Sequence, residues 1–462
     1  MDLRLSAAIA AGRGSGAVIR RLGRGGGTAA PGLLANLLDP DILDKLSRRV
    51  SGGCVVIAGT NGKTTTARLL AGILERAGRR VVHNRAGSNL VRGVTAALTD
   101  STSLMGTFQA DIAVLESDEA AFPEIVRRTR PRLVVLLNLF RDQLDRYGEL
   151  DTVARHWGDA LYGLGVAQTV LVNADDPALA VATEELAATR LTFGFSEARI
   201  VLARLPHAAD ATSCRRCGAP LRYEALYLSH LGDYACAACG YRRPALDYAL
   251  HDLELHGLDS AGARIETPAG RLEVAAGLPG VYNAYNVLAA AAAALHLGAS
   301  PGAVLEGIGG FQAAFGRIER VDYEGRHLVV VLIKNPTGFN EVLRMLVSDG
   351  LSDPALILIN DRAADGRDVS WLWDVDVEPL AEVPAPLYTG GIRGQDMAVR
   401  LKYAGVEAGR ISVLDDLPQA LDVFVDRLAP GGTGYILPTY TAMLKLREVL
   451  AARGVIQPFW RQ

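Results

Sequence analysis

The sequence predicts an α/β protein with two domains: a larger one with a doubly wound, mostly parallel sheet and an inserted four-cysteine ribbon, and a smaller Rossmann-like one. Short apolar runs alternate with helical segments along most of the chain, which is typical of parallel sheets covered by helices on both faces. A glycine-rich stretch at 59–66 joins the first strong apolar run to a helix, and two C-x2-C pairs interrupt the alternation between 214 and 239. These three observations set the predicted organisation.

The composition is that of a folded, multidomain chain. Its 462 residues, 49% of them hydrophobic, suffice for two or three domains with cores of their own. The formal net charge of −3 gives no overall attraction to nucleic acid, so an anionic ligand must be held by local groups. No apolar run reaches the roughly 18 to 20 residues needed to cross a bilayer, and we expect a soluble, cytoplasmic protein.

The N-terminal 24 residues predict a short amphipathic helix that carries several arginines. Because the arginines interrupt the apolar residues, the segment suits neither a secretory signal nor a cleavage site. A solvated helix face is the favoured interpretation, and peripheral contact with an anionic membrane surface stays open.

The glycine-rich stretch predicts a phosphate-binding loop. It consists of Gly59, Thr60, Asn61, Gly62, Lys63, Thr64, Thr65 and Thr66. The glycines let backbone N–H groups turn toward a phosphate, and the N-terminus of the following helix adds partial positive charge. Lys63 is placed to reach the β- and γ-phosphates of a bound nucleotide, and the hydroxyl of Thr64 or Thr65 is placed to ligate Mg²⁺. Ile57 stands where the full motif has its first glycine, so the loop is a shortened variant. The alternative, a plain glycine turn, is disfavoured by the strand before it and the helix after it.

A second apolar run, 111–115, ends in the acidic group Glu116-Ser117-Asp118-Glu119. A carboxylate at the carboxyl end of a parallel strand, beside a phosphate loop, is where a Mg²⁺ ligand belongs. We therefore predict Glu116 as that ligand, with a solvated acidic turn as the alternative. Further buried strands are expected at 133–138 and 169–173.

Four of the five cysteines predict a structural zinc site. They are Cys214, Cys217, Cys236 and Cys239, with eighteen residues between the two pairs. Glycines directly after each pair allow tight turns on which four thiolates converge, and four thiolates leave Zn²⁺ no open position for catalysis. We expect a zinc ribbon over about 205–243. A disulfide framework is the alternative, disfavoured in a long chain without a secretory signal.

A domain boundary is expected near residue 315, which divides the chain into a domain 1–315 and a domain 316–462. The second domain again alternates strand and helix. Its expected strands and helices are 328–333, 355–359, 387–391, 397–403, 433–437 and 441–452.

Several short blocks, in this order and spacing, resemble the Mur ligase family, whose members join an amine to a carboxylate through an ATP-made acyl phosphate. The blocks are 59–66, Glu116, Asn138, 142–145, 173–176, Asn283, 285–286 and 316–317. The resemblance covers about residues 40 to 320 and implies the family's central ATPase domain. It implies phosphate binding by Gly62, Lys63, Thr64 and Thr65, Mg²⁺ ligation by Glu116, and adenine contacts from Asn283.

The chain also departs from that pattern. Only 58 residues precede Gly59, too few for the nucleotide-substrate domain that many Mur ligases carry there. Gln143 stands where the family usually has a metal-binding His, so the sequence leaves open whether a second Mg²⁺ site exists. The segment 332–338 replaces the family's usual acidic strand end.

A truncated Mur-type core with a four-cysteine ribbon, followed by the stretches 334–336 and 364–374, closely resembles the MurT-type ligase subunits of lipid II isoglutaminyl synthases. This resemblance covers nearly the whole chain. This resemblance implies ATP-dependent amidation of the D-glutamate α-carboxylate of lipid II, with ammonia from a separate glutaminase subunit. It places Asp368 against that partner, where it orients the His of a Cys-His pair. A polar turn is the alternative for Asp365 and Asp368, because Asp-Gly is a turn signal.

Local chemistry favours the need for such a partner. Glutamine hydrolysis of this kind uses a thiolate, but four cysteines are assigned to zinc and Cys54 falls in a buried strand.

Two rival functions remain at this stage. The first is a ligase similar to folylpolyglutamate synthase, which adds an amino acid without a glutaminase. The second is a nucleic-acid-binding module that uses the ribbon arginines, for which the basic footprint is thin. These arginines are Arg215, Arg216, Arg242 and Arg243.

Overall fold

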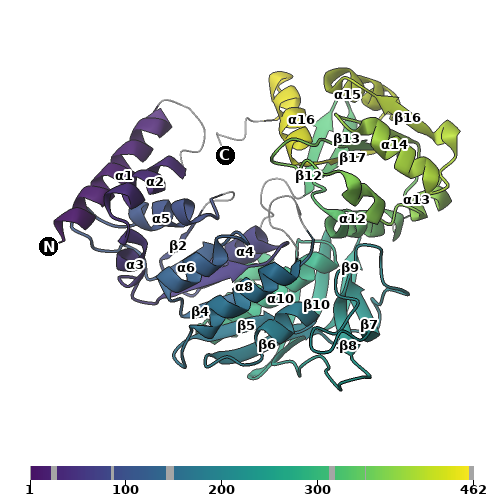
Figure 1. Ribbon diagram of the computed structural model, residues 1–462. Coiled ribbons are helices and arrows are strands. Elements are labelled where there is room, and N and C mark those ends of the chain that lie inside the picture. Colours follow the sequence, from purple (N-terminus) through teal and green to yellow (C-terminus); the bar gives the residue numbers. More distant parts are fainter. Residues whose placement is uncertain are drawn as a thin grey trace. The chain divides into compact units, whose positions relative to one another are not determined.

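The computed structural model describes residues 2–21, 29–84, 88–141, 150–311, 318–348 and 350–456 (Figure 1). The chain divides into two compact units. Unit 1 comprises Met1–Phe140, Glu149–Arg204 and Ala211–Gln312, and unit 2 comprises Arg141–Gly148, Leu205–Asp210 and Ala313–Gln462. The boundary expected near residue 315 falls at 312–317, outside the described residues, and stays a prediction.

Unit 1 is built on a sheet whose described strands number nine, in the order β11-β10-β9-β6-β5-β4-β1-β3-β2. Their bounds are β1 (Cys54–Ala58), β2 (Val81–His83), β3 (Ile112–Glu116), β4 (Leu133–Leu136), β5 (Thr169–Asn173), β6 (Thr189–Phe195), β9 (Tyr248–His256), β10 (Ser260–Thr267) and β11 (Gly270–Ala276). All neighbours from β2 to β9 pair in parallel, and β9, β10 and β11 pair antiparallel. The predicted doubly wound, mostly parallel sheet is confirmed.

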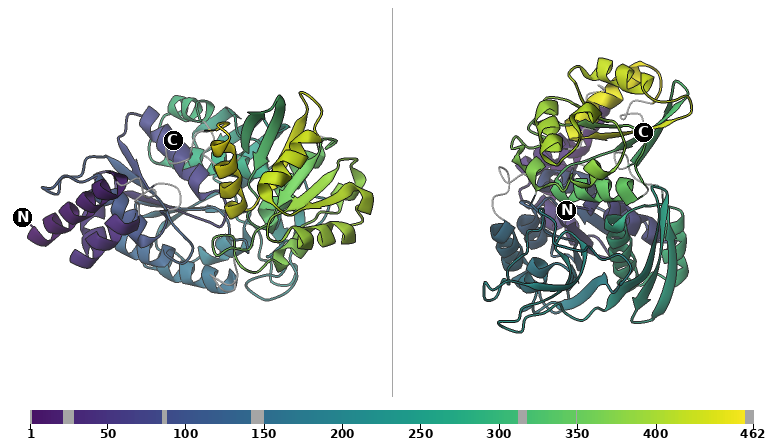
Figure 2. Two further views of the ribbon diagram at one scale, coloured as in Figure 1. Left: turned by 90° about the horizontal axis from the view of Figure 1, so that it is seen from above. Right: turned by 90° about the vertical axis from the view of Figure 1, so that its right-hand side faces the viewer.

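Strand β1 shows why helices cover both faces of this sheet. All five of its residues are buried, and successive side chains point to opposite faces. Val55 and Ile57 belong to one core, Cys54, Val56 and Ala58 to the other. The first core is closed by α4 (Lys63–Arg76), α10 (Val281–His296) and α11 (Pro301–Gly309). The second is closed by α1 (Leu3–Arg21), α2 (Ala29–Leu38), α3 (Ile42–Ser47), α5 (Val91–Asp100), α6 (Phe122–Thr129), α8 (Leu150–Tyr162) and α9 (Pro177–Ala182) (Figure 2).

The N-terminal helix expected from the sequence is present as α1, and α2 and α3 were not anticipated. Helix α2 packs very closely on α5, which Gly32 permits because it has no side chain. A Cβ added there would lie 1.7 Å from the carbonyl oxygen of Arg92. Among the described residues, none of the helices has the length and apolar character of a membrane span.

Between β6 and β9 the chain forms the ribbon, with the antiparallel hairpin β7 (Arg222–Leu228) and β8 (Leu231–Ala235). Since β6 and β9 are themselves parallel neighbours in the sheet, the ribbon is an insertion between adjacent strands.

Unit 2 has a six-stranded sheet, counted over its described residues, in the order β12-β13-β17-β14-β15-β16. The strands are β12 (Ile318–Tyr323), β13 (Arg326–Val331), β14 (Ala355–Leu358), β15 (Leu387–Gly390), β16 (Ile411–Leu414) and β17 (Thr433–Pro438). The helices are α12 (Pro336–Ser348), η1 (Ser370–Asp374), α13 (Pro379–Glu382), α14 (Gly394–Tyr403), η2 (Ala408–Arg410), α15 (Leu417–Asp426) and α16 (Tyr440–Ala452). Only β12 runs antiparallel to its neighbour, so the alternation expected for this part of the chain forms a second parallel sheet.

Candidate nucleotide site and four-cysteine cluster

The glycine-rich loop lies where the sheet of unit 1 changes direction. Strand β1 sits between β3 and β4, so the chain first winds toward β2 and β3 and later continues on the other side through β4 and β5. In open parallel sheets, ligands bind outside the carboxyl ends of the strands at such a switch point. The loop follows β1 at that edge and leads directly into α4, whose first residue is Lys63.

Two glycines fix the path of this loop. Gly62 has a φ of +89°, which favours glycine, and a Cβ there would lie only 2.0 Å from Oδ1 of Asn286. A Cβ on Gly59 would lie 2.8 Å from Cβ of Leu137, at the end of the neighbouring strand. The loop is therefore held between β4 and α10 with no room for side chains at these positions.

Asn138, which follows β4, clamps the loop. Its Oδ1 accepts a hydrogen bond of 2.8 Å from the backbone N–H of Asn61, and its Nδ2 donates to the carbonyl of Asn61 at 3.1 Å. The backbone N–H of Thr60 donates to the carbonyl of Asn138 at 3.0 Å. The sequence placed Asn138 at this edge, and the structure shows that it orders the loop backbone.

Lys63 is nearly buried and forms an ion pair that the sequence did not reveal. Its Nζ lies 2.9 Å from Oε1 of Glu119, which is also buried, and it donates to the carbonyl oxygens of Gly59 and Thr60. The backbone carbonyl of Glu119 in turn accepts a hydrogen bond of 3.0 Å from Nε1 of Trp157. Glu119 thus balances the charge of Lys63 and holds it folded back against the loop.

Glu116, the predicted Mg²⁺ ligand, is buried at the end of β3 and lies in register with Ile57 of β1. Its backbone is fixed by Asn84, which accepts from its N–H at 2.8 Å and donates to its carbonyl at 2.9 Å. The acidic turn expected as the alternative would be solvated, whereas Glu116 and Glu119 are both buried.

The hydroxyls of the loop differ in their surroundings. The buried Oγ1 of Thr65 finds no hydrogen-bond partner among the residues that the structure describes. Thr64, the residue predicted to ligate Mg²⁺, is half-buried. A buried hydroxyl without a partner costs free energy unless a ligand satisfies it, so this loop is suited to a nucleotide phosphate with its metal.

Asn283 and Asn286 lie on the first two turns of α10, and Asn286 contacts the loop. Oδ1 of Asn286 accepts from the Thr66 hydroxyl at 3.3 Å, and its Nδ2 donates to Oδ1 of Asn283 at 3.2 Å. Nδ2 of Asn283 donates to the carbonyl of Pro279 at 2.8 Å. The predicted adenine-contacting residue, Asn283, is therefore linked to the loop through Asn286.

Not every predicted block can be located. Residues 142–145, which include Gln143, and residues 316–317 lie outside the described part of the chain.

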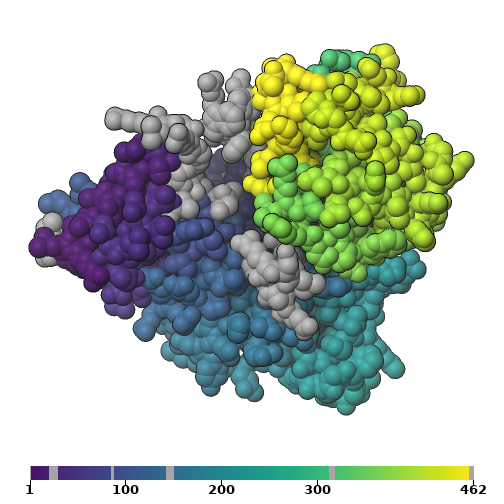
Figure 3. All heavy atoms as spheres, turned by 45° about the horizontal axis from the view of Figure 1, so that its top comes forward, coloured from purple at the N-terminus to yellow at the C-terminus, as the bar shows by residue number. Residues whose placement is uncertain are grey.

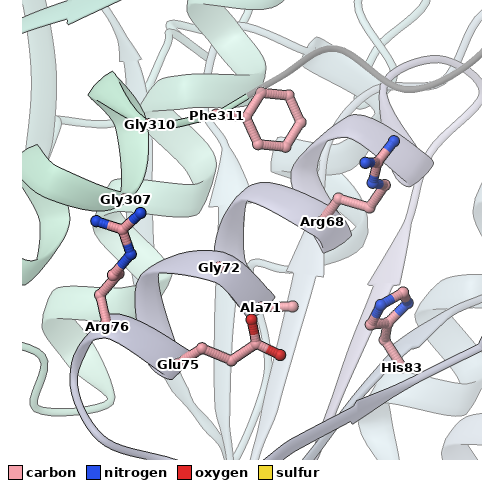
Figure 4. A pocket seen from close by; sticks show the side chains of 9 residues that line it. All are labelled: Arg68, Ala71, Gly72, Glu75, Arg76, His83, Gly307, Gly310 and Phe311. Carbon is pink, nitrogen blue, oxygen red and sulfur yellow. The ribbon is translucent and has the colours of Figure 1, made fainter.

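A cavity of about 370 Å³ lies along α4 (Figure 4). It is lined by Arg68, Ala71, Gly72, Glu75, Arg76, His83, Gly307, Gly310 and Phe311. The guanidinium carbon of Arg68 lies 5.7 Å from the ring centre of Phe311. No sequence expectation fell on these residues, because α4, β2 and α11 meet only in the fold.

The four cysteines of the ribbon come together as the spacing predicted. Their sulfur atoms all lie within 4.8 Å of one another, with Sγ–Sγ distances of 3.6 Å for Cys214–Cys239 and 3.5 Å for Cys217–Cys236. Four sulfurs at about 2.3 Å from one Zn²⁺ would be about 3.8 Å apart. The cluster therefore fits a tetrahedral zinc ion.

The two pairs have the same local geometry. In one, the N–H of Gly218 donates to the carbonyl of Cys214 at 2.8 Å; in the other, the N–H of Gly240 donates to the carbonyl of Cys236 at 3.0 Å. Both glycines have φ near +76°, at 77° and 75° respectively. The tight turns expected from these glycines are present in both pairs.

In unit 2, Asp365 and Asp368 have different surroundings. Asp365 is buried and accepts hydrogen bonds from the backbone N–H and the hydroxyl of Thr441, at 2.7 and 2.5 Å. Asp368 is exposed, and its Oδ1 accepts from the N–H of Ser370 at 2.8 Å. Asp365, which also accepts from the backbone N–H of Arg362 at 3.2 Å, therefore ties its turn to the start of α16, while Asp368 presents its carboxylate at the surface.

Comparison with known proteins identifies the family. Residues 57–234 match the Mur ligase middle domain, and residues 332–443 match the MurT ligase C-terminal domain. The chain is 36% identical, over 99% of both sequences, to the MurT subunit of the glutamine-hydrolysing lipid II isoglutaminyl synthase of Streptococcus pneumoniae. The chain belongs to the MurT family of Mur ligases. A MurT subunit of Staphylococcus aureus strain COL is 32% identical over 92% of this chain and 93% of its own.

Solved structures show that the MurT-family chain has a Mur ligase fold. It matches the pseudomurein peptide ligase type C of Methanothermus fervidus with a TM-score of 0.67 at 21% identity, covering 88% of this chain and 80% of that one. It matches MurF of Acinetobacter baumannii with a TM-score of 0.65 at 18% identity, covering 91% and 80%. At these identities the likeness concerns the fold.

Proposed function

We propose that this chain is the ligase subunit of a lipid II isoglutaminyl synthase. ATP transfers its γ-phosphoryl group to the α-carboxylate of D-glutamate in lipid II, which gives an acyl phosphate and ADP. Ammonia then attacks the carbonyl carbon, phosphate leaves, and loss of a proton from nitrogen yields D-isoglutamine. The reaction modifies a peptidoglycan precursor, and we place it in the cytoplasm at the inner face of the membrane.

The loop at the switch point carries the ATP assignment. Its backbone, ordered by Asn138, presents N–H groups at the N-terminus of α4, and the Thr65 hydroxyl lacks a partner among the described residues. Gly59, Thr60, Asn61, Gly62, Lys63, Thr64, Thr65 and Asn283 are the proposed nucleotide-binding residues. A phosphate arriving at the loop competes with Glu119 for Lys63, which then neutralises charge on the transferred group.

Buried carboxylates at the same edge suit a bound Mg²⁺. Glu116 is the proposed protein ligand together with the Thr64 hydroxyl, and Thr65 is the alternative hydroxyl because of its unsatisfied oxygen. When bound, Mg²⁺ would offset the negative charge of the β- and γ-phosphates.

The four-cysteine cluster is the proposed site of a structural Zn²⁺. Cys214, Cys217, Cys236 and Cys239 would fill all four positions of a tetrahedral ion and leave none for a substrate. The zinc would therefore stabilise the ribbon and take no part in the chemistry.

Ammonia must come from another chain in this proposal. Burial raises the pKa of the Cys54 thiol to about 12, so it stays protonated and cannot attack glutamine near neutral pH. The other four cysteines belong to the cluster. We propose a glutaminase subunit as the partner, forming a heterodimer, with the exposed Asp368 orienting the partner's catalytic His.

Replacement of Lys63 tests the assignment. Lys63→Ala should abolish amidation of lipid II with ATP and ammonium, while Lys445→Ala, at an exposed lysine of α16, should leave it unchanged. Because Lys63→Ala leaves Glu119 buried without its partner, the double variant Lys63→Ala/Glu119→Gln and the melting temperature of each protein separate loss of chemistry from loss of folding. Normal amidation by a folded Lys63 variant would refute the proposal.

The nitrogen source distinguishes this function from a ligase that adds an amino acid by itself. With ammonium the chain should work alone, and with glutamine it should need the glutaminase. Addition of an amino acid without any glutaminase would favour the rival ligase.

A further inference from the structure

The first two helices of unit 1 carry large apolar side chains on the surface. These side chains are Leu3 and Val18 on α1 and Leu33, Leu34, Leu37 and Leu38 on α2, which together we call the N-terminal leucine face. Leu3 is 76% exposed and Leu37 is 69% exposed. Figure 3 shows the N-terminal residues, in purple, at the surface of the molecule. Clusters of exposed leucines of this kind mark interaction sites.

Helix α1 is apolar on two sides. Its inner side, with Leu5, Ala8 and Ile9, is packed into the core of unit 1. On its outer side, Leu3, Ala7, Ala10, Gly14 and Val18 recur at helical spacing and are exposed. An ordinary surface helix has polar residues there, so the outer stripe of α1 is not explained by folding of this chain.

The two helices hold this stripe and the leucines of α2 in one fixed unit. Nε of Arg4 donates to the carbonyl of Leu38 at 2.8 Å, which ties the start of α1 to the end of α2. A Cβ on Gly12 would lie 3.3 Å from the carbonyl oxygen of Pro31, so the helices are in close contact midway along α1. Leu3 therefore lies at the same end of the pair as Leu38.

The charge of this segment is opposite to that of the whole chain. Between residues 3 and 38 there is no Asp or Glu, and there are five arginines, although the protein has a net charge of −3. The arginines are Arg4, Arg13, Arg20, Arg21 and Arg24. A segment that is both apolar and purely basic is complementary to an anionic lipid surface, where each arginine adds attraction to the headgroups.

We propose that the N-terminal leucine face docks on an anionic lipid bilayer, with the leucines entering the boundary between headgroups and acyl chains. Leucines favour this occupant over a protein, because the centres of protein interfaces rely on Trp, Tyr and Arg anchors in shaped pockets. The contact is peripheral, since neither α1 nor α2 is a membrane span. Its physiological role, holding the enzyme beside lipid II, rests on the proposed function, but the docking can be measured without it.

The test is cosedimentation of the full-length chain with vesicles of phosphatidylglycerol and phosphatidylcholine, or of phosphatidylcholine alone. The protein should bind the anionic vesicles at least about tenfold more tightly, and 0.5 M NaCl should weaken that binding. Leu34→Asp/Leu37→Asp should reduce binding by at least about tenfold. The matched control is Tyr162→Asp/Val166→Asp, which adds the same two negative charges at residues that are 72% and 83% exposed, at the end of α8 and on the loop before β5.

Two further measurements make the outcome decisive. Melting temperatures establish that the variants are folded, and amidation of a short-chain, water-soluble lipid II analogue should be unchanged in Leu34→Asp/Leu37→Asp. Equal vesicle binding by that variant and wild type, or loss of glutaminase binding with vesicle binding intact, would overturn the proposal. Loss of vesicle binding with full activity on the soluble analogue supports docking, whereas an inactive wild type would contradict the proposed function alone.

Discussion

Alanine in place of Gly62 should detach the phosphate loop from α10. At φ +89° a residue other than glycine costs about 1–2 kcal/mol. The added Cβ would lie 2.0 Å from Oδ1 of Asn286, so that amide must move away from both Thr66 and Asn283. Two buried hydrogen bonds at about 1 kcal/mol each bring the loss of stability to about 3–4 kcal/mol.

The assay is thermal unfolding with and without ATP and Mg²⁺. A loss of about 3 kcal/mol should lower Tm by about 5 °C in a unit of about 300 residues, and the increase in Tm on adding ATP should disappear. Gly72→Ala is the matched control, because Gly72 lies on α4 and an added Cβ there meets no atom within 4 Å. That variant should be as stable as wild type, or up to about 1 kcal/mol more stable. A Gly62→Ala protein that melts within about 1 °C of wild type and gains the same stability from ATP would refute this account of the loop.

Three other changes test separate parts of the chain. Burial raises the pKa of Glu341 from 4.5 to about 7, and Arg344, 3.7 Å away, lowers it only in part. The folded state thus holds a proton that the unfolded chain has released, so stability should fall by about 3 kcal/mol as pH rises from about 4.5 to 7. Urea titrations should show that slope in wild type and a flatter one in Glu341→Gln, and identical slopes would contradict the burial argument. The variant Cys217→Ser/Cys239→Ser changes the two exposed cysteines of the cluster. It should lose its bound zinc, measured by atomic emission, and its Tm should fall. An unchanged zinc content would exclude a four-thiolate site. Asp368→Ala should reduce glutamine-dependent amidation at least about tenfold, because the partner's His is no longer oriented. Ammonium-dependent amidation should stay intact. Equal losses with both nitrogen sources would show that Asp368 has a structural role instead.

The sheets could be predicted because their strands are continuous apolar runs. In β1 and β4 every residue is buried, as parallel strands covered on both faces require. The phosphate loop was equally visible, since glycine, lysine and threonine follow such a run in a fixed order. The cysteine spacing also predicted the cluster, because each C-x2-C pair forms a tight turn whose geometry depends only on neighbouring residues.

Contacts between distant segments could not be predicted in this way. Glu119 stood in the acidic group after β3, but its pairing with Lys63 depends on how β3 and α4 are placed by the sheet. Helix α2 has apolar residues on both its packed side and its exposed side. It therefore lacks the alternation of apolar and polar residues by which a surface helix is predicted from sequence. The cavity along α4 is a product of three elements that are far apart in the sequence.

The ribbon arginines show how the fold decides between functions that the sequence left open. Arg215 pairs with Asp151, and Arg216 lies 2.6 Å from Glu184. These pairs already use charges that a nucleic-acid-binding surface would need. The folded ribbon therefore offers nucleic acid fewer available basic side chains than its sequence suggests.

Arg243, which also pairs with Asp233, connects the ribbon to the nucleotide site through Asp175. Asp175 is fully buried after β5; its Oδ1 lies 2.7 Å from Arg243 and its Oδ2 accepts from the Tyr285 hydroxyl at 2.6 Å. Burial raises the pKa of Asp175. Arg243, Tyr285 and the backbone N–H of Phe195, which donates to Oδ2 at 2.8 Å, oppose that shift, so the carboxylate depends on them. Tyr285 precedes Asn286, the residue that closes on Gly62. The last arginine of the ribbon and Tyr285 of α10 thus share one buried carboxylate. For this reason a ribbon remote from the chemistry can stabilise the loop proposed to bind ATP.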